Sequence, residues 1–418
     1  MRLDNTIIKN ISSLFSIKIA GYLVPLITLP YLVRVLEPVG YGQLGFCLAI
    51  IQYFIIFVNY GFDLSATQKV AQNFNDKYAI SLIFWNVLFA RLLMTVLGLV
   101  ILFLLSKFNQ TISEYFTILI CGYLSVLGTA LFPQWLFQGK ERLGVISTLK
   151  IITQLIGLPL IFIFINKPGD VWLAALLSSL PSILIVFFSS YLIIKRGWIS
   201  WRKPSIYNIV LELKDGWHLF LSTAAISIYT TSITVALGII AGPVSVAIYV
   251  SANKLLQAAQ GLYTPLSTAF YPRINNLMKK SADEGLAAIR YLMKMQFILT
   301  FIISVCLFIF APYVVEFLYG DEYAKASTVL RVLSVLPVII GLSNIFGIQT
   351  LLVHGYKKEF SKILLLSGLI SIFTLLPLCY LFASVGAAFS VVITEFIVTV
   401  LMLKEVLNKK IPLFKRSL

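Results

Sequence analysis

Three charged side chains fall near the middle of segments that are otherwise apolar. Arg91 lies about twelve residues into one apolar run, Lys254 about eight residues past a turn, and Glu395 at a similar depth in the last run. At 1.5 Å per residue, twelve helical residues span roughly 18 Å, which is close to a bilayer midplane. A charge at that depth is costly, so we expect each one to face a water-filled cavity or a partner.

Two roles are open for the deep cations. Arg91 and Lys254 could line a binding cavity, or they could form an internal ion pair with Glu395. Two cations against one carboxylate leave an excess of positive charge, which suits an anionic cargo because phosphate oxygens can replace the water that buried cations have lost. Arg34 and Lys18 are shallower candidates for the same cationic cavity, although their depth also suits anchoring among lipid headgroups.

Other residues within the apolar runs suggest ion coupling and bending. Glu395 and Asp63 are candidates for coupling to protons or sodium, because carboxylates titrate and ligate hard cations. Pro25, Pro30 and Pro265 remove backbone hydrogen bonds and are candidate hinges. The shallow charges at Lys150, Lys294 and Arg331 are interpreted as anchors.

The composition is that of a helical membrane protein. Of 418 residues, 59% are hydrophobic and 12% are charged, and the mean hydropathy is +0.93. The apolar runs are too long and too uniform for the strands of a barrel, so they predict helices. Four cysteines without CxxC spacing and two histidines indicate no metal, no cofactor and no disulfide. The 33 basic residues are scattered over short loops, which argues against nucleic acid as a partner.

We expect an all-α polytopic protein with about twelve membrane spans. The predicted spans are 12–33, 41–60, 79–104, 114–137, 145–165, 171–194, 216–240, 247–270, 291–314, 326–353, 361–382 and 385–403. No cleavable signal peptide is expected, since no small-residue cleavage site follows the first run.

Basic residues alternate between successive gaps. One side of the predicted membrane collects 23 Lys and Arg residues and the other side only 4. Basic loops stay on the cytoplasmic side, so both termini are expected to be cytoplasmic. The gaps on the other side are short and leave no room for a catalytic domain, which argues against an enzyme.

Two halves of six helices are expected. The turn Glu37–Gly40 after the first span resembles the turn Gly242–Ser245 after the seventh, and an even number of helices makes the copies parallel, with a pseudo-two-fold axis along the membrane normal. Ile206, Ile209, Val210 and Leu213 have the spacing of an amphipathic helix lying in the cytoplasmic interface. The predicted domains are an N-terminal lobe (1–194), an amphipathic linker (195–215), a C-terminal lobe (216–403) and a basic tail (404–418).

Several segments, in order along the chain, resemble a known family. Pro30–Leu36, Asn59–Thr67, Tyr271–Ile274, Phe317–Tyr323 and Leu351–Gly355 are similar to segments of Wzx-type O-antigen (polysaccharide repeat-unit) flippases. The resemblance implies a superfamily that also holds multidrug and toxic-compound extruders and the lipid II flippase. Its members have two six-helix lobes around a central cavity, the architecture of the multidrug extruders (MATE-like).

The resemblance implies a function and one site residue. Such flippases move undecaprenyl-pyrophosphate-linked sugars outward across the bacterial inner membrane. Ser251–Leu255 resembles a motif of the lipid II flippase in which an arginine stands in a cationic cavity, and Lys254 takes that place here. Two additional helices of the lipid II flippase have no counterpart in this length of chain, which favours the O-antigen branch.

Transport of a lipid-linked oligosaccharide by alternating access is therefore the leading hypothesis. Its expected partners are that substrate and the lipid bilayer, with a polysaccharide polymerase and a chain-length regulator as further candidates. The alternatives are a multidrug or cation exporter of the same superfamily, for which an acidic cleft would be expected, and a membrane glycan polymerase or acyltransferase, for which the outer loops are too short.

Overall fold

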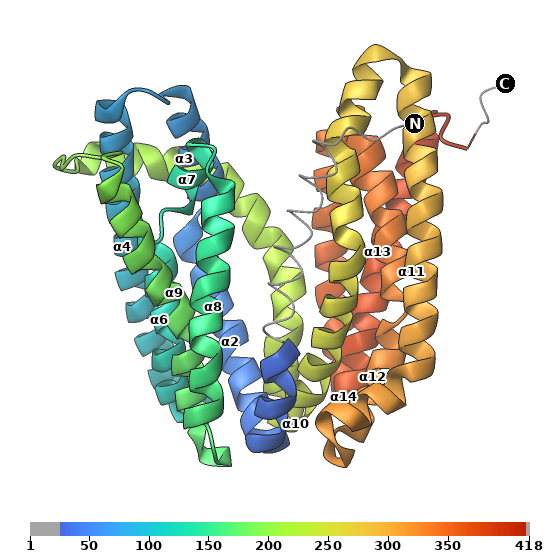
Figure 1. Cartoon of the computed structure of the whole chain (residues 1–418). Helices are drawn as coiled ribbons and strands as arrows, with labels where there is room; N and C mark the ends of the chain where they lie inside the picture. Colours follow the sequence, from blue (N-terminus) through green and yellow to red (C-terminus); the bar gives the residue numbers. More distant parts are fainter. Residues whose placement is uncertain (1–25, 415–418) are drawn as a thin grey trace. The chain divides into compact units, whose positions relative to one another are not determined.

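The computed structural model describes residues 26–414, apart from the side chains of residues 143, 218–219, 222–223, 225–226 and 228–230. These residues form helices joined by short loops, and no strand occurs among them (Figure 1). Nine helices of this part of the chain are long and apolar enough to cross a membrane, and the shorter apolar helix Leu26–Val35 precedes them. The predicted all-α polytopic fold is confirmed.

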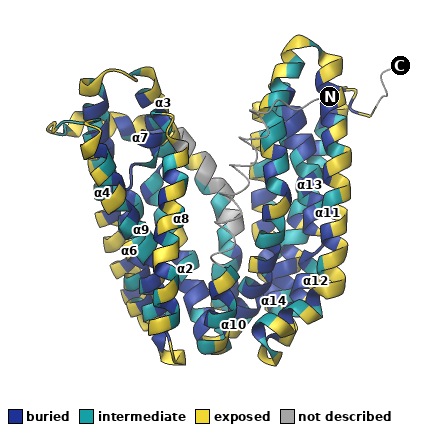
Figure 2. Cartoon of the chain, viewed as in Figure 1, coloured by how far each residue is buried: buried dark blue, intermediate teal, exposed yellow. Residues whose placement is uncertain are grey.

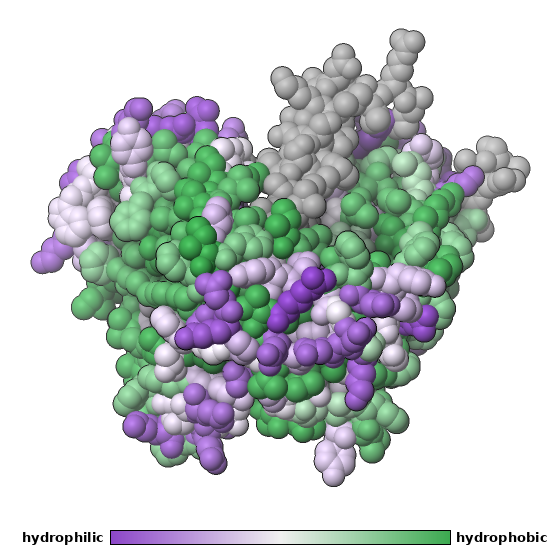
Figure 3. Space-filling model, turned by 60° about the horizontal axis from the view of Figure 1, so that its bottom comes forward, coloured by the Kyte–Doolittle hydropathy of each residue, from purple (hydrophilic) through white to green (hydrophobic). Residues whose placement is uncertain are grey.

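The outer surface is suited to lipid. Broad apolar areas (green) lie between patches of hydrophilic side chains (purple) in Figure 3. Large apolar residues such as Phe103, Ile309 and Phe373 are half or more exposed on membrane-length helices. Exposed apolar faces of this extent need a lipid solvent rather than water.

The helices form two compact units by their contacts. One unit is Val35–Val235, and the other combines Ala236 onward with the residues up to Arg34. In Figure 2 the buried residues (dark blue) lie where helices of the same unit pack together. The predicted division into lobes at the 195–215 linker, and the cytoplasmic position of the termini, remain predictions.

The unit Val35–Val235 holds helices α2 to α9 and the start of α10. Small residues allow its helices to approach closely, since a Cβ on Gly128 would clash with the carbonyl oxygen of Ser182. The elements are α2 (Glu37–Asn59), α3 (Phe62–Gln72), α4 (Lys77–Phe108), α5 (Gln110–Glu114), α6 (Phe116–Leu131), α7 (Gln134–Gly139), α8 (Leu143–Phe164), η1 (Pro168–Asp170), α9 (Val171–Lys195) and the beginning of α10 (Ile206–Lys280).

The other unit packs the rest of α10 with the C-terminal helices. Its apolar core includes Ile289, Phe346 and Met402. The elements are α11 (Ala282–Tyr319), η2 (Asp321–Tyr323), α12 (Ala324–Leu333), α13 (Leu336–Asn344), the π-helix η3 (Ile345–Leu352) and α14 (Lys357–Asn408).

Two long helices contain a break where the sequence predicts a loop. Gly242 in α10 has φ 77° and ψ 178°, which glycine adopts readily. Ala383 in α14 has φ 48° and ψ −126°. The breaks separate the predicted spans 216–240 from 247–270 and 361–382 from 385–403, so each of these helices carries two predicted spans.

The predicted amphipathic segment is the first part of α10, which begins at Ile206. Ile206 and Val210 are exposed, whereas Glu212 is buried. Lys69 of α3 binds Glu212 at 2.8 Å and Asp215 at 2.7 Å, so α3 is tied to this segment by ion pairs. Burial raises the pKa of Glu212 despite the nearby lysine.

Candidate functional site: a charged cavity in the unit Val35–Val235

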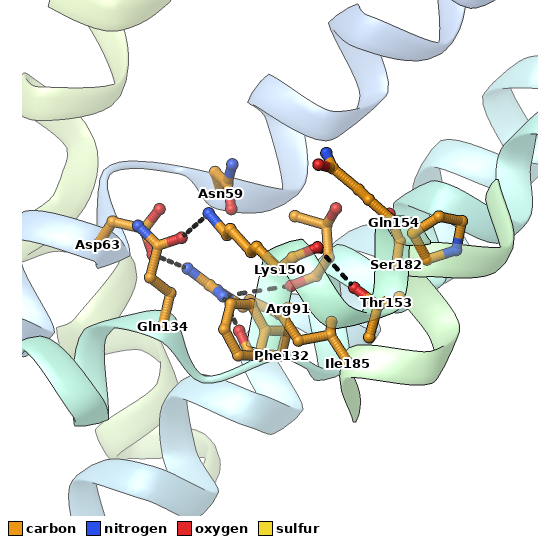
Figure 4. A pocket seen from close by; sticks show the side chains of 13 residues that line it. Asn59, Asp63, Arg91, Phe132, Gln134, Lys150, Thr153, Gln154, Ser182 and Ile185 are labelled. Carbon is orange, nitrogen blue, oxygen red and sulfur yellow. Dashed lines mark hydrogen bonds and ion pairs between the residues drawn. The ribbon is translucent and has the colours of Figure 1, made fainter. Parts of the chain in front are cut away.

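A cavity of about 360 Å³ opens among the helices of this unit (Figure 4). Its volume falls within the range of roughly 300–1,000 Å³ that is usual for small-ligand pockets. Helices α2, α3, α4, α6, α7, α8 and α9 supply parts of its wall, together with Phe132 between α6 and α7. The lining residues are Asn59, Asp63, Arg91, Gly128, Thr129, Phe132, Gln134, Lys150, Thr153, Gln154, Pro181, Ser182 and Ile185.

Arg91 is the most deeply placed charge of the cavity. Its side chain is 1% exposed, and its Nη2 lies 2.7 Å from Oδ1 of Asp63, whose side chain is 34% exposed. Nη1 donates to the carbonyl oxygens of Phe132 (3.2 Å) and Thr129 (3.4 Å). Nε is buried and has no hydrogen-bond partner among the described residues, so the guanidinium keeps an unpaired N–H that a ligand oxygen could accept.

A proline break supplies the carbonyls that hold Arg91. Helix α6 ends at Leu131, and Pro133 precedes α7. Proline has no N–H, so it cannot bond to the carbonyl four residues earlier, which is that of Thr129. The sequence thereby leaves a backbone acceptor inside a membrane-length helix, and the arginine satisfies it.

A second break places Asp63. Tyr60 (φ 45°) and Gly61 (φ 79°) are in the left-handed region between α2 and α3, and Asp63 lies in the first turn of α3. The N-terminal end of a helix stabilises a negative charge. Thr67 of α3 donates to the carbonyl oxygen of Trp135 at 3.3 Å, which holds α3 against α7. Interrupted helices therefore border the cavity from two sides.

Lys150 is a cation of this cavity that sequence reasoning assigned to anchoring. Its Nζ donates to Oε1 of Gln134 at 2.7 Å and lies 5.9 Å from the ring centroid of Phe132. Gln154 lies four residues later on α8 and also lines the cavity. The i,i+4 spacing of Lys150 and Gln154 is the one signal that could have placed them on a common face.

The cavity carries an excess of positive charge. Arg91 and Lys150 face a single carboxylate, that of Asp63, and the remaining lining residues are neutral. Electrostatic attraction is stronger at a site that membrane helices shield from water than it is in water itself. An anion such as a phosphate could take hydrogen bonds from both cations, and charge-assisted hydrogen bonds of this kind are short and strong.

The other predicted site residues that the structure describes are not among the residues that line this cavity. Lys254 of α10 is exposed and has no ion pair or hydrogen bond among the described residues. Arg34 is exposed, and its Nη2 donates to the carbonyl oxygen of Phe317 at 2.6 Å. Glu395 of α14 is half-buried, and the ion pairs of the described residues do not include it. The deep arginine pairs with Asp63, and its pairing with Glu395 stays a prediction.

The structure describes two of the three hinge candidates. Pro30 lies in the helix Leu26–Val35, and Pro265 is buried in α10, where the non-helical backbone angles are at Gly242 instead. Pro25 and Lys18 lie outside the described residues.

Comparison with known proteins decides the family. The model of the family described as "Polysaccharide biosynthesis protein" matches residues 7–278. The chain belongs to this family. It is 37% identical to the "Putative O-antigen transporter" of Escherichia coli (strain K12), over 96% of this chain and 97% of that protein. A protein of the same name from Shigella dysenteriae is 30% identical, over 95% of this chain and 99% of the relative.

Solved structures share the fold. The lipid II flippase MurJ in an inward closed conformation superposes with a TM-score of 0.78 at 15% identity, over 96% of this chain and 88% of that structure. An inward-facing multidrug resistance MATE family transporter superposes with a TM-score of 0.73 at 14% identity, over 95% and 100%. The resemblance read from the sequence is thereby confirmed for family and fold.

Proposed function

We propose that this protein is a flippase that moves an undecaprenyl-pyrophosphate-linked oligosaccharide, an O-antigen repeat unit, from the cytoplasmic to the periplasmic leaflet of a bacterial inner membrane. The observation that carries the proposal is the cavity in which Arg91 and Lys150 outnumber Asp63. The names of the relatives, which are O-antigen transporters, support the same cargo. Transport needs no covalent chemistry, in keeping with a protein that is not an enzyme.

The pyrophosphate would enter the cavity by competing with Asp63 for Arg91. The unpartnered Nε of Arg91 and the ammonium of Lys150 are donors for its oxygens. The polyprenyl chain would remain in lipid while the headgroup crosses by alternating access. Lys254, Arg34 and Lys18 are proposed as further cations along the route of the headgroup.

The ion pair suggests how an ion could drive release. Asp63 is one-third exposed, so a coupling ion could reach its carboxylate from the cavity. A cation bound to this carboxylate would weaken its attraction to Arg91 and leave the guanidinium for the cargo, whereas release of the cation would restore the pair and expel the cargo. Glu395 is proposed as the second coupling carboxylate, and Pro25, Pro30 and Pro265 as hinges of the lobe motion.

A deletion strain tests the proposal. Loss of the gene should abolish surface polysaccharide while lipid-linked repeat units accumulate, and the wild-type gene should restore the polymer. Arg91→Gln should fail to restore it, Arg91→Lys should restore it in part, and Lys107→Gln, at an exposed cation outside the cavity, should restore it fully. Surface polymer is measured on gels after normalising for the amount of protein in the membrane.

Unchanged surface polymer in the deletion strain would overturn the proposal. If the deletion instead sensitises cells to cationic drugs, the multidrug exporter becomes the better assignment. Glycan chain growth by the purified protein would favour the polymerase alternative.

A further inference from the structure

The unit Ala236–Leu418 contains a second cavity with a different chemistry. It has a volume of about 380 Å³ and lies among α10, α11, α13 and the π-helix η3. None of its lining residues is charged, and most carry a hydroxyl or a carboxamide. The lining residues are Gln260, Tyr263, Thr264, Ser267, Thr268, Tyr271, Gln296, Ile340, Asn344, Ile348 and Gln349.

The carboxamides of this cavity are held in place by buried hydrogen bonds. Gln296 accepts from Oγ of Ser267 at 2.7 Å and donates to the carbonyl oxygen of Gly341 at 3.1 Å. Nε2 of Gln349 donates to the carbonyl oxygen of Ser267 at 3.0 Å. Both glutamines are 1% exposed. A polar group fixed in this way presents its remaining hydrogen-bonding atoms in a defined direction.

One acceptor in the wall is left over. Oε1 of Gln349 is buried and has no hydrogen-bond partner among the described residues. A buried amide oxygen without a partner destabilises the fold, so an unpaired acceptor at a cavity wall indicates that a ligand supplies the donor. A hydroxyl group of a ligand would supply it.

The backbone at this wall is also unusual. Ile345–Leu352 is a π-helix, and the hydroxyl of Thr350 donates to the carbonyl oxygen of Ile345, five residues earlier, at 2.8 Å. Segments of π-helix are rare and occur frequently at functional sites. Here the segment carries Ile348 and Gln349 into the cavity wall, directly after Asn344 of α13.

We propose that this cavity binds an uncharged sugar ring of the lipid-linked oligosaccharide. Sugar hydroxyls both donate and accept, as do the carboxamides and hydroxyls of the wall, and the rings of Tyr263 and Tyr271 offer apolar faces to the C–H groups of a sugar. A phosphate would lose its hydration here without meeting a cation. The inference rests on the proposed flippase function and assigns it a sugar subsite.

The test compares two probes on the full-length protein in lipid nanodiscs. One probe is the lipid-linked repeat unit extracted from membranes of the deletion strain, and the other is undecaprenyl pyrophosphate without sugar. Gln349→Leu should weaken binding of the sugar-bearing probe about tenfold, corresponding to one to two lost hydrogen bonds, and leave the Kd of undecaprenyl pyrophosphate unchanged. Gln260→Leu should act in the same direction, and its half-buried side chain makes the variant less disruptive to folding.

Gln257→Leu is the matched control, because it makes the same exchange on α10 at a residue outside the cavity lining. It should leave both Kd values unchanged. The sugar subsite is overturned if Gln349→Leu and Gln260→Leu bind the sugar-bearing probe as tightly as the wild type, or weaken both probes equally. Failure of the wild type to bind either probe would instead overturn the flippase function on which the inference rests.

Discussion

Each of the two cavities has a polar residue at the same position of a long helix, but one of these residues is charged and the other is neutral. Arg91 and Gln296 each lie fourteen residues after the first residue of their helices, Lys77 of α4 and Ala282 of α11. Four residues later each helix has a threonine whose hydroxyl donates to the carbonyl oxygen of that residue, at 2.8 Å in both helices. The two units therefore share a pattern in which a polar residue is followed, four residues later, by a threonine that bonds to its carbonyl oxygen.

The partners differ in charge. Arg91 binds the carboxylate of Asp63, whereas Gln296 accepts a hydrogen bond from the hydroxyl of Ser267. Each of the two also donates to main-chain carbonyls, those of Thr129 and Phe132 in one unit and that of Gly341 in the other. One unit thus carries an ion pair and the other a neutral pair at the same helix position, in keeping with the proposed phosphate site and the proposed sugar subsite.

The largest effect is expected when the ion pair is broken on one side. Asp63→Ser should destabilise the protein by about 2–3 kcal/mol, because it leaves a guanidinium that is 1% exposed without its counter-charge. This loss of stability is smaller than that expected for a fully buried ion pair, since Asp63 is partly exposed. The double variant Asp63→Ser with Arg91→Gln copies the neutral pair of Ser267 and Gln296 and should recover most of that loss.

Thermal unfolding in detergent measures the stability, and surface polymer in the deletion strain measures function. We expect function to stay lost in the double variant, because the cavity no longer holds an arginine. A double variant that is less stable than Asp63→Ser would show that the two pairs are not interchangeable and would break the comparison.

The sequence drew attention to Arg91 but not to the neutral cavity, for a physical reason. A charge in an apolar run has few explanations, so its depth left two roles for Arg91, a cavity wall or an internal ion pair. Its partner could not be identified, since Asp63 becomes adjacent only through the left-handed residues Tyr60 and Gly61 between α2 and α3. The position of Lys150 in its predicted span indicates an anchor, because depth in the membrane does not show toward which neighbours a side chain points.

The neutral cavity gave no signal in the sequence. Gln296 and Gln349 are single amides in apolar helices, where many polar residues serve only to join helices. The sequence of the π-helix that carries Gln349 contains no motif that predicts this conformation. By contrast, the length of the apolar runs follows from composition and the break at Gly242 from turn chemistry, so the helical membrane fold was predicted.

An intermediate effect is expected when the neutral pair is broken. Gln296→Leu should destabilise the protein by about 1–2 kcal/mol, because the hydroxyl of Ser267 and the carbonyl of Gly341 lose a buried partner. Ser327→Ala is the control in the same unit, since its half-buried hydroxyl donates, among the described residues, only to the carbonyl oxygen of Ala324 in its own helix, α12. Equal losses in stability for Asp63→Ser and Gln296→Leu would contradict the difference in charge between the two sites.

The smallest effect on stability, but a clear one on binding, is expected for the second cation of the charged cavity. Lys150 is exposed, and among the described residues its ammonium contacts only Gln134 and the ring of Phe132. Lys150→Gln should therefore change the free energy of unfolding by no more than about 0.5 kcal/mol. The Kd of undecaprenyl pyrophosphate should rise about fivefold to tenfold, since one charge-assisted hydrogen bond is lost.

Salt dependence separates that charge effect from a change in shape. The wild type should bind undecaprenyl pyrophosphate less tightly as ionic strength rises, and Lys150→Gln should reduce the slope, because fewer charges attract the anion. Lys107→Gln removes a cation outside the cavity and should leave both the Kd and the slope as in the wild type. A Lys150→Gln variant with the wild-type slope would mean that the pyrophosphate contacts Arg91 alone, and the cationic half of the comparison would reduce to a single residue.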